Sequence, residues 1–175
     1  MITSSRYRVG TAAFVCALML GGCGLLPHSD RPVHPMTDEE SMAQVINAGR
    51  QLRKVAGLQD VSGGGYLAFC NDDGDPPNKG YLEMSALLPA GVNGHDYAEQ
   101  VKAAMLASGW SDKLPSQHMY GGTINRDGVA VNIEYYQGES RLAFKIYGEC
   151  RNMTNHHGDS KNNGTNLTKE LNSDG

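Results

Sequence analysis

The N-terminal segment constrains what the rest of the chain can be, because it combines the parts of a secretory signal peptide and ends on a cysteine. Arg6 and Arg8 precede an apolar run over residues 9–20, and two glycines separate this run from Cys23. A basic start, a short apolar core and small residues at the end are typical of a signal that is removed during export. The apolar run is shorter than the about 20 residues that a membrane-spanning helix needs. We therefore expect residues 1–22 to be a signal peptide that takes no part in the fold.

The sequence Leu20-Gly21-Gly22-Cys23 resembles the lipobox of bacterial lipoproteins. This resemblance implies that a diacylglycerol is attached to the Cys23 thiol and that the signal is cut just before this residue. An ordinary cleaved signal and a transmembrane helix are the alternatives. Stable attachment to a membrane takes two acyl chains or one chain with a second signal, and a diacylglycerol supplies both chains. We expect a protein that is anchored by lipid on Cys23 to the outer face of the cytoplasmic membrane.

The charge of the chain limits the partners that it can bind. Removal of Arg6 and Arg8 with the signal leaves thirteen of the 15 basic residues against 19 acidic ones, so the formal charge changes from −4 to −6. An acidic chain without a Lys/Arg cluster is not expected to bind nucleic acid or to dock electrostatically on anionic lipid. The length of the mature chain allows one domain.

The four cysteines fit an exported protein. Cys16 leaves with the signal and Cys23 carries the lipid, so Cys70 and Cys150 remain as a pair in an oxidising compartment. Two buried free thiols or part of a metal site are the alternatives, although neither residue has further Cys or His at short spacing. The pair favours a disulfide between Cys70 and Cys150.

The hydrophobic pattern predicts one domain over residues 36–151, behind a proline-containing tether over residues 23–35. Thr37 and Glu40 form a capping box that opens a helix ending near Ala56, and Asp96 with Glu99 opens a second one. The glycines at 62–65 indicate a flexible break. Alternating apolar residues then predict strands over 66–70, 80–88, 119–124, 129–136 and 141–150. The fold class is α+β, in the order αββαβββ, with an about five-stranded, mainly antiparallel sheet and two helices on one face.

From residue 152 the composition is dominated by Asn, Asp, Gly, Ser, Thr, Lys and His. Such a segment buries too little apolar surface to offset its ordering entropy. We expect residues 152–175 to be a disordered polar tail.

Three stretches of the chain are distinctive when taken together: the contexts of the two cysteines, at residues 70–77 and 148–157, and the Ala103-Ala104-Met105-Leu106 stretch with Gly109-Trp110. They resemble mycobacterial lipoproteins of the LppJ family. The resemblance covers most of the chain. It implies the lipid anchor and the cysteine pair, and it transfers no catalytic residues, because the family is described by its anchor and not by an activity.

No sequence motif of a known catalytic site is present, and we expect neither an enzyme nor a bound cofactor. Asp72, Asp73 and Asp75 could hold a cation, but the spacing differs from that of a calcium-binding EF-hand loop. The adjacent His156 and His157 could bind a transition metal, yet they lie in the predicted tail without a fixed second shell. The sequence does not decide whether either group binds a cation, and we predict no metal site.

The candidate binding site is the sheet face that two helices cannot cover. By alternation, this face carries Tyr81, Asn132, Glu134, Tyr136, Lys145 and Tyr147. Tyrosines among hydrogen-bonding groups suit a glycan, a lipid head group or an envelope protein, whereas cross-strand packing for stability is the simpler explanation. The sequence thus favours a non-catalytic binding or accessory module in the envelope. The alternatives are a hydrolase whose site is assembled only in three dimensions and a structural subunit of an envelope complex.

Overall fold

The structure is a computed structural model that describes residues 34–113 and 124–173. The signal peptide, Cys23, most of the tether and most of the predicted strand 119–124 lie outside these residues. One antiparallel sheet runs through the described domain in the order β3-β4-β5-β2-β1-β6. The strands are β1 (Gln59–Phe69), β2 (Asn78–Leu87), β3 (Ile124–Arg126), β4 (Val129–Glu134), β5 (Arg141–Tyr147) and β6 (Thr165–Asn166), and the helices are α1 (Asp38–Ala56), α2 (Gly94–Ala107) and α3 (Thr168–Asn172). The α+β class is confirmed, but the sheet has six strands where about five were predicted.

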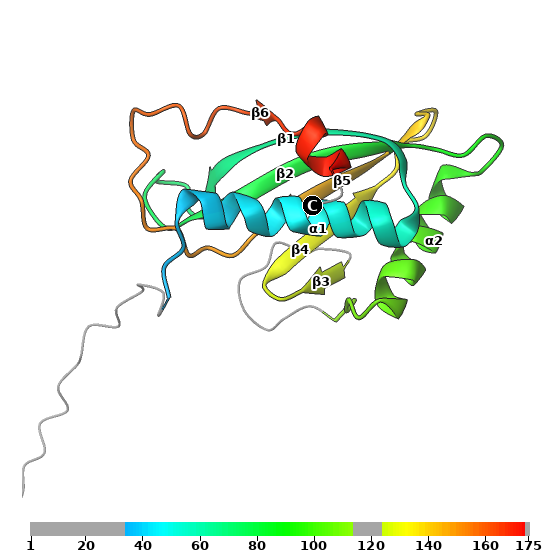
Figure 1. Cartoon of the computed structure of the whole chain (residues 1–175), viewed down its shortest axis with the longest axis horizontal. Coiled ribbons are helices and arrows are strands. Elements are labelled where there is room, and N and C mark those ends of the chain that lie inside the picture. The colour runs from blue at the N-terminus through cyan, green and yellow to red at the C-terminus, as the bar shows by residue number, and fades with distance from the viewer. Residues whose placement is uncertain (1–33, 114–123, 174–175) are drawn as a thin grey trace, which may run out of the picture. The chain divides into compact units, whose positions relative to one another are not determined.

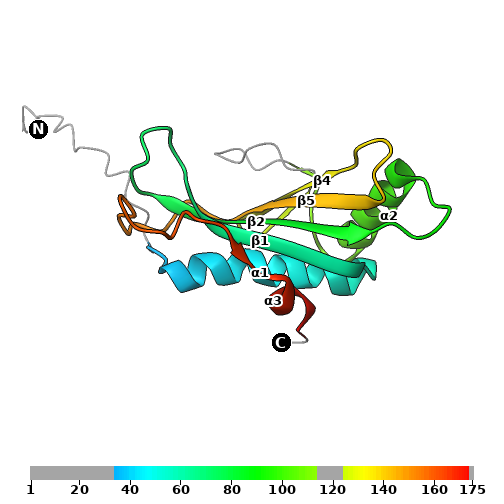
Figure 2. The same ribbon diagram turned by 90° about the horizontal axis from the view of Figure 1, so that it is seen from above.

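Helix α1 begins and ends where its capping signals predict. The Thr37 hydroxyl accepts a hydrogen bond from the Glu40 amide at 3.2 Å, and the Glu40 carboxylate accepts one from the Thr37 amide at 2.8 Å. Gly57 ends the helix with a φ of 64°, a conformation that glycine adopts without steric cost. The helix lies along one face of the sheet, and α3 lies on the same side (Figures 1 and 2). The opposite face is therefore left without a helix from α1 or α3.

The predicted flexible break at residues 62–65 is wrong, because these residues form the middle of β1. Their glycines are needed for close packing. A Cβ at Gly65 would lie 2.5 Å from the Tyr81 carbonyl oxygen and 3.0 Å from Leu167, and one at Gly63 would lie 2.9 Å from Leu171. Glycine here permits the C-terminal segment to approach the strand, and the sequence alone showed only the flexibility of the residue type.

Helix α2 has a different cap from the one predicted at Asp96. The side chain of Asn93 accepts hydrogen bonds from the amides of His95 and Asp96, so the helix begins at Gly94, two residues earlier. The ring of Tyr135 occupies the space that a Cβ of Gly94 would need, at 2.0 Å. A tertiary contact thus fixes the first residue of this helix.

The prediction of a disordered tail over 152–175 is also wrong for its described residues. Strand β6 pairs with β1, and the side chains of Leu171 and Leu167 are 0% and 8% exposed. The amide of Asn78 donates to the Asn152 carbonyl at 2.7 Å, which joins the start of this segment to β2. The segment has few apolar residues, but two of them enter the core. The domain therefore extends to the C-terminal segment instead of ending at residue 151.

Candidate functional site

The sheet face opposite α1 carries a row of three tyrosines on three adjacent strands. Tyr66 in β1 pairs with Tyr81 in β2, and Tyr81 pairs with Tyr147 in β5. The ring centroids lie 5.0 Å apart for the first pair and 5.2 Å for the second, in tilted orientations that favour aromatic contact. We call this surface the tyrosine face; its other members are Lys79, Glu83, Asn132, Glu134 and Lys145.

A charged cluster borders the tyrosine row. Lys145 in β5 lies opposite Glu83 and Asn132 in the neighbouring strands, and its ammonium contacts the Glu134 carboxylate at 2.9 Å. The Tyr136 hydroxyl donates to the same carboxylate at 2.6 Å. This hydrogen bond from Tyr136, together with Lys145, holds the pKa of Glu134 below its usual value despite the opposing effect of burial. The carboxylate therefore stays ionised and fixes both partners.

The structure brings five of the six predicted residues together on one face. Tyr136 is the partial exception, because β4 ends at Glu134 and the Tyr136 side chain extends beyond the strand, 56% exposed. It reaches the face only through its hydrogen bond to Glu134. Tyr136 therefore lies at the border of the tyrosine face and not within it.

The predicted site omitted three residues of the tyrosine face, namely Tyr66, Lys79 and Glu83. Tyr66 extends the tyrosine row onto β1, and Lys79 is only 6% exposed, with its ammonium 5.5 Å from the centre of the Tyr147 ring. Lys79 belongs to β2, which begins at Asn78 and not at Gly80 as predicted. Alternation with Tyr81 would have placed Lys79 on this face if the strand had been predicted to begin two residues earlier.

These side chains line a shallow hollow of about 410 Å³. Its lining consists of Tyr66, Ala68, Phe69, Lys79, Tyr81, Lys145 and Tyr147. Burial, with a smaller effect of Glu83, raises the pKa of Tyr81, and burial raises that of Tyr147. Burial lowers the pKa of Lys79. The hollow thus combines protonated phenols with two amine side chains.

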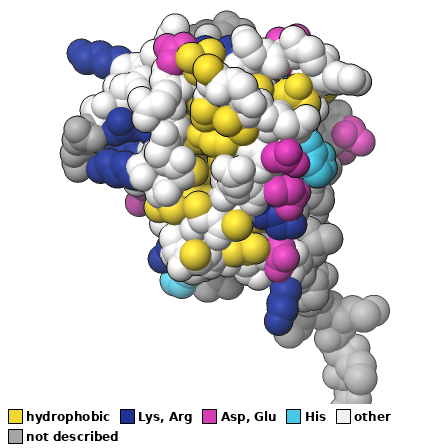
Figure 3. Space-filling view, turned by 90° about the vertical axis from the view of Figure 1, so that its right-hand side faces the viewer, with side chains coloured by type: hydrophobic (Ala, Val, Ile, Leu, Met, Phe, Trp, Pro, Cys, Tyr) yellow, Lys and Arg dark blue, Asp and Glu magenta, His cyan; other side chains and the backbone are white. Residues whose placement is uncertain are grey.

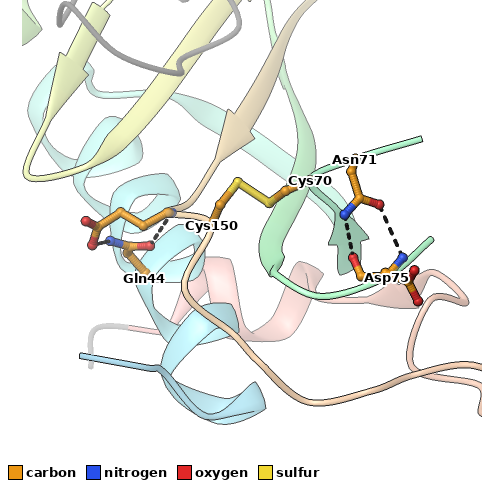
Figure 4. The surroundings of a disulfide bond; sticks show 6 residues. Gln44, Cys70, Asn71, Asp75 and Cys150 are labelled. Atoms are coloured by element: carbon orange, nitrogen blue, oxygen red, sulfur yellow. Dashed lines mark hydrogen bonds between the residues drawn. A yellow bond between two sulfur atoms is a disulfide. The ribbon is translucent and has the colours of Figure 1, made fainter. Parts of the chain in front are cut away.

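The predicted disulfide between Cys70 and Cys150 is present, with their Cα atoms 6.0 Å apart (Figure 4). It joins the end of β1 to the segment after β5, close to the Phe69 end of the hollow. The turn that follows Cys70 is closed by two hydrogen bonds between Asn71 and Asp75. The alternatives of free thiols and of a metal site at these cysteines are therefore excluded in this structure.

The two histidines of the C-terminal segment do not form one site. The His157 ring contacts Asp75 at 2.9 Å, whereas the buried His156 ring lies between Asp159 at 2.7 Å and Asp38 at 3.1 Å. Within the described residues, no three His, Cys, Asp or Glu side chains are grouped so that they could hold a metal ion. His156 instead joins the C-terminal segment to the first residue of α1.

Acid is expected to loosen this connection at Asp38. Burial alone raises the pKa of Asp38, but the hydrogen bond from Asn152 and the charge of His156 outweigh it and hold the pKa below the ordinary 3.8. Because the unfolded chain takes up the proton first, the contribution of Asp38 to stability is present above about pH 4 and is lost as the pH falls below it. Unfolding measured from pH 7 to pH 2 should show a steeper loss for the wild type than for Asp38→Asn.

The matched control for this measurement is Asp72→Asn, which changes an exposed carboxylate in the turn after β1. It should keep the acid dependence of the wild type. Equal slopes for the wild type and Asp38→Asn would show that Asp38 does not stabilise the folded state through its charge.

The fold and the site define a small disulfide-bonded α+β domain with one helix-covered and one tyrosine-bearing sheet face. The chain belongs to the LppJ family, since the family described as "Putative lipoprotein LppJ" matches residues 37–170. A relative of that name from Mycobacterium bovis is 39% identical, over 94% of this chain and 91% of its own length. Two from strains of Mycobacterium tuberculosis are also 39% identical, over 95% of this chain and 94% of their length.

No solved structure matches the chain. Membership of the family makes the protein a lipoprotein, and the names of the relatives state no activity. Among the residues described, no helix is long and apolar enough to cross a membrane.

Proposed function

We propose that this protein is an envelope-anchored lipoprotein whose domain is a non-catalytic binding module. The anchor is the lipid on Cys23, attached to the outer face of the cytoplasmic membrane. Support comes from the signal-like segment before Cys23 and from the lipoprotein family to which the chain belongs. A diacylglycerol holds a domain at a membrane without any spanning helix.

The tyrosine face is the observation that carries the binding role. Its tyrosines and charged side chains stand on paired strands of a sheet, so their positions are fixed by backbone hydrogen bonds. Tyrosine offers apolar area and a polar tip at low entropic cost, which is why it is enriched in binding surfaces. The hollow between these side chains gives a ligand a concave surface.

Two observations favour binding over hydrolysis. The raised pKa values of Tyr81 and Tyr147 keep their phenols protonated at neutral pH, so neither acts as a base or nucleophile there. The buried His156 engages Asp38 and Asp159 with its two ring nitrogens and does not line the hollow. A hydrolytic site would need a base within hydrogen-bond reach of a bound substrate.

Mass spectrometry of the full-length protein, purified in detergent from a mycobacterial host, tests the anchor. We expect the mature chain to begin at Cys23 and to carry a diacylglycerol. An N-terminus at another residue, or an unmodified Cys23, would contradict the anchoring part of the proposal.

The binding role is tested with the variant Tyr81→Ser/Tyr147→Ser in the same full-length protein. Purified cell-wall polysaccharide, soluble lipid head groups and solubilised envelope proteins are each assayed for binding; whole vesicles are avoided because the Cys23 lipid would insert into them in every variant. We expect one of these components to bind the wild type and not the double variant. The control Lys54→Ser, on the opposite side of the domain, should bind that component as the wild type does. Removal of the two cross-strand tyrosine contacts should cost about 1–2 kcal/mol of stability and leave the fold intact.

A second candidate, a structural subunit of an envelope complex, is favoured by the surface at the α2 end of the domain. Hydrophobic side chains gather there, bordered on one side by acidic side chains and a histidine (Figure 3). Leu87 at the end of β2, which is 42% exposed, and Tyr136 are among the exposed large hydrophobic residues of the described domain. Exposed apolar area of this kind suits a protein contact. Loss of a protein partner in Leu87→Ser, with the tyrosine variant unaffected, would favour this candidate.

A further inference from the structure

The charged side chains that line the hollow in the tyrosine face are basic, although the chain as a whole is acidic. Two of its lining side chains, Lys79 and Lys145, are basic, and none is acidic. Lys145 contacts Glu134, and Glu134 and Glu83 lie on the same face without lining the hollow. The Lys79 ammonium lies 5.5 Å from the centre of the Tyr147 ring, so its charge stands beside the tyrosine row. The two amines of the lining therefore favour an anionic group.

The tyrosines that line the hollow indicate what kind of group carries the anion. Tyr66, Tyr81 and Tyr147 provide a row of rings across three strands, which offers apolar contact together with hydroxyl groups. A sugar ring has the matching chemistry, because its C–H bonds make apolar contact with an aromatic ring while its hydroxyls form hydrogen bonds. Glu83 in β2 and Lys145 in β5 lie two residues from Tyr81 and Tyr147, and Asn132 in β4 lies opposite Lys145. These side chains can present carboxylate, ammonium and amide groups to the sugar hydroxyls.

We propose that the hollow binds an anionic sugar, a sugar unit that carries a phosphate or a carboxylate. The anion contacts the Lys79 and Lys145 ammonium groups, and the sugar ring lies on the tyrosine row. This proposal rests on the binding role of the tyrosine face and names the ligand class for it. A protein segment would need a longer groove than this shallow hollow provides, and a neutral sugar would gain nothing from the charge of the two lysines.

Calorimetric titration of the full-length protein in detergent tests the ligand class. The probes are glucose 6-phosphate, glucuronate, glucose and inorganic phosphate. We expect the two charged sugars to bind and glucose to bind at least about tenfold more weakly, the loss that corresponds to one charge-assisted hydrogen bond. Inorganic phosphate should also bind more weakly, because it has no sugar ring to lie on the tyrosine row. Equal binding of glucose and glucose 6-phosphate, or no binding of either charged sugar, would overturn the proposal.

Two lysine variants keep the test independent of folding. Lys79→Met removes the charge and keeps an unbranched side chain only one atom shorter, and Lys145→Gln changes a partly exposed side chain. We expect each variant to bind glucose 6-phosphate about tenfold more weakly than the wild type. The control Lys54→Gln on α1 should bind it with the wild-type affinity. Near-UV circular dichroism checks that each variant is folded. Wild-type affinity in both hollow variants would overturn the proposal.

Soluble glycerophosphoglycerol, the head group of phosphatidylglycerol without its acyl chains, separates a sugar ligand from a lipid head group, because the lipid on Cys23 would itself insert into whole vesicles. We expect glucose 6-phosphate to bind more tightly than this head group, and tighter binding of the head group would overturn the assignment to a sugar. If neither charged sugar binds but Tyr81→Ser/Tyr147→Ser still loses its envelope component, the ligand class is wrong and the binding role stands. If that variant also retains every component, the binding role itself is wrong.

Discussion

Replacing both Cys70 and Cys150 with serine is expected to lower the free energy of unfolding by about 4.5 kcal/mol. The bond joins residues 80 apart, so it removes a large loop-closure entropy from the unfolded chain. This is a substantial share of the about 5–15 kcal/mol that stabilises an ordinary domain. Chemical unfolding of the oxidised wild type and of the double variant measures the difference.

Reduction of the wild type is the control for this experiment. The reduced wild type should unfold at the same denaturant concentration as the double serine variant, because both lack the same cross-link. A difference of less than about 1 kcal/mol between oxidised wild type and double variant would contradict the expected role of the disulfide.

Leu171→Ala is expected to cost about 3 kcal/mol, although this residue lies in the segment whose composition indicates disorder. Its side chain is 0% exposed and packs at Gly49 of α1 and Gly63 of β1. Truncation of a fully buried leucine removes its contacts and leaves a cavity. Thermal or chemical unfolding measures the loss.

Val55→Ala is the matched control for the Leu171 variant. It truncates a side chain of α1 that is 38% exposed and should cost less than about 1 kcal/mol. A Leu171 variant as stable as the wild type would mean that α3 does not belong to the core and that the tail is disordered after all.

The parts of the fold that could be predicted from the sequence depend on neighbouring residues. The capping box of Thr37 and Glu40 and the stop at Gly57 are contained in α1 and its flanks. Alternation in β5 placed Leu142, Phe144 and Ile146 in the core, where all three are 0% exposed. Local signals of this kind need no knowledge of what packs against them.

The parts that could not be predicted depend on contacts between distant residues. Gly63 and Gly65 read as a flexible break because glycine is permissive, but in the fold they make room for Leu171 and Leu167. The polar tail is ordered because Asn152 and His156 find a partner in Asp38, more than a hundred residues earlier. Composition measures how much a segment can bury, and it does not show which single residues reach the core.

The binding site was predicted only in outline, because only part of its pattern is local. Alternation placed Tyr81, Tyr147 and Lys145 correctly on one face, since strand periodicity is a local property. Tyr66 and Lys79 join them only through the register of β1 with β2 and the exact start of β2. The hollow is a product of that register, and no single stretch of sequence contains it.

The most direct test of the tyrosine face as the binding surface is photo-crosslinking of the full-length protein in intact envelopes. A photoreactive residue replaces Glu83, which is exposed beside Tyr81, or Lys54 on α1, or Leu87 near the α2 end. We predict a crosslinked glycan, lipid or protein product with the residue at position 83 and none at position 54. Products at position 54 or 87, with none at position 83, would contradict a binding role for the tyrosine face.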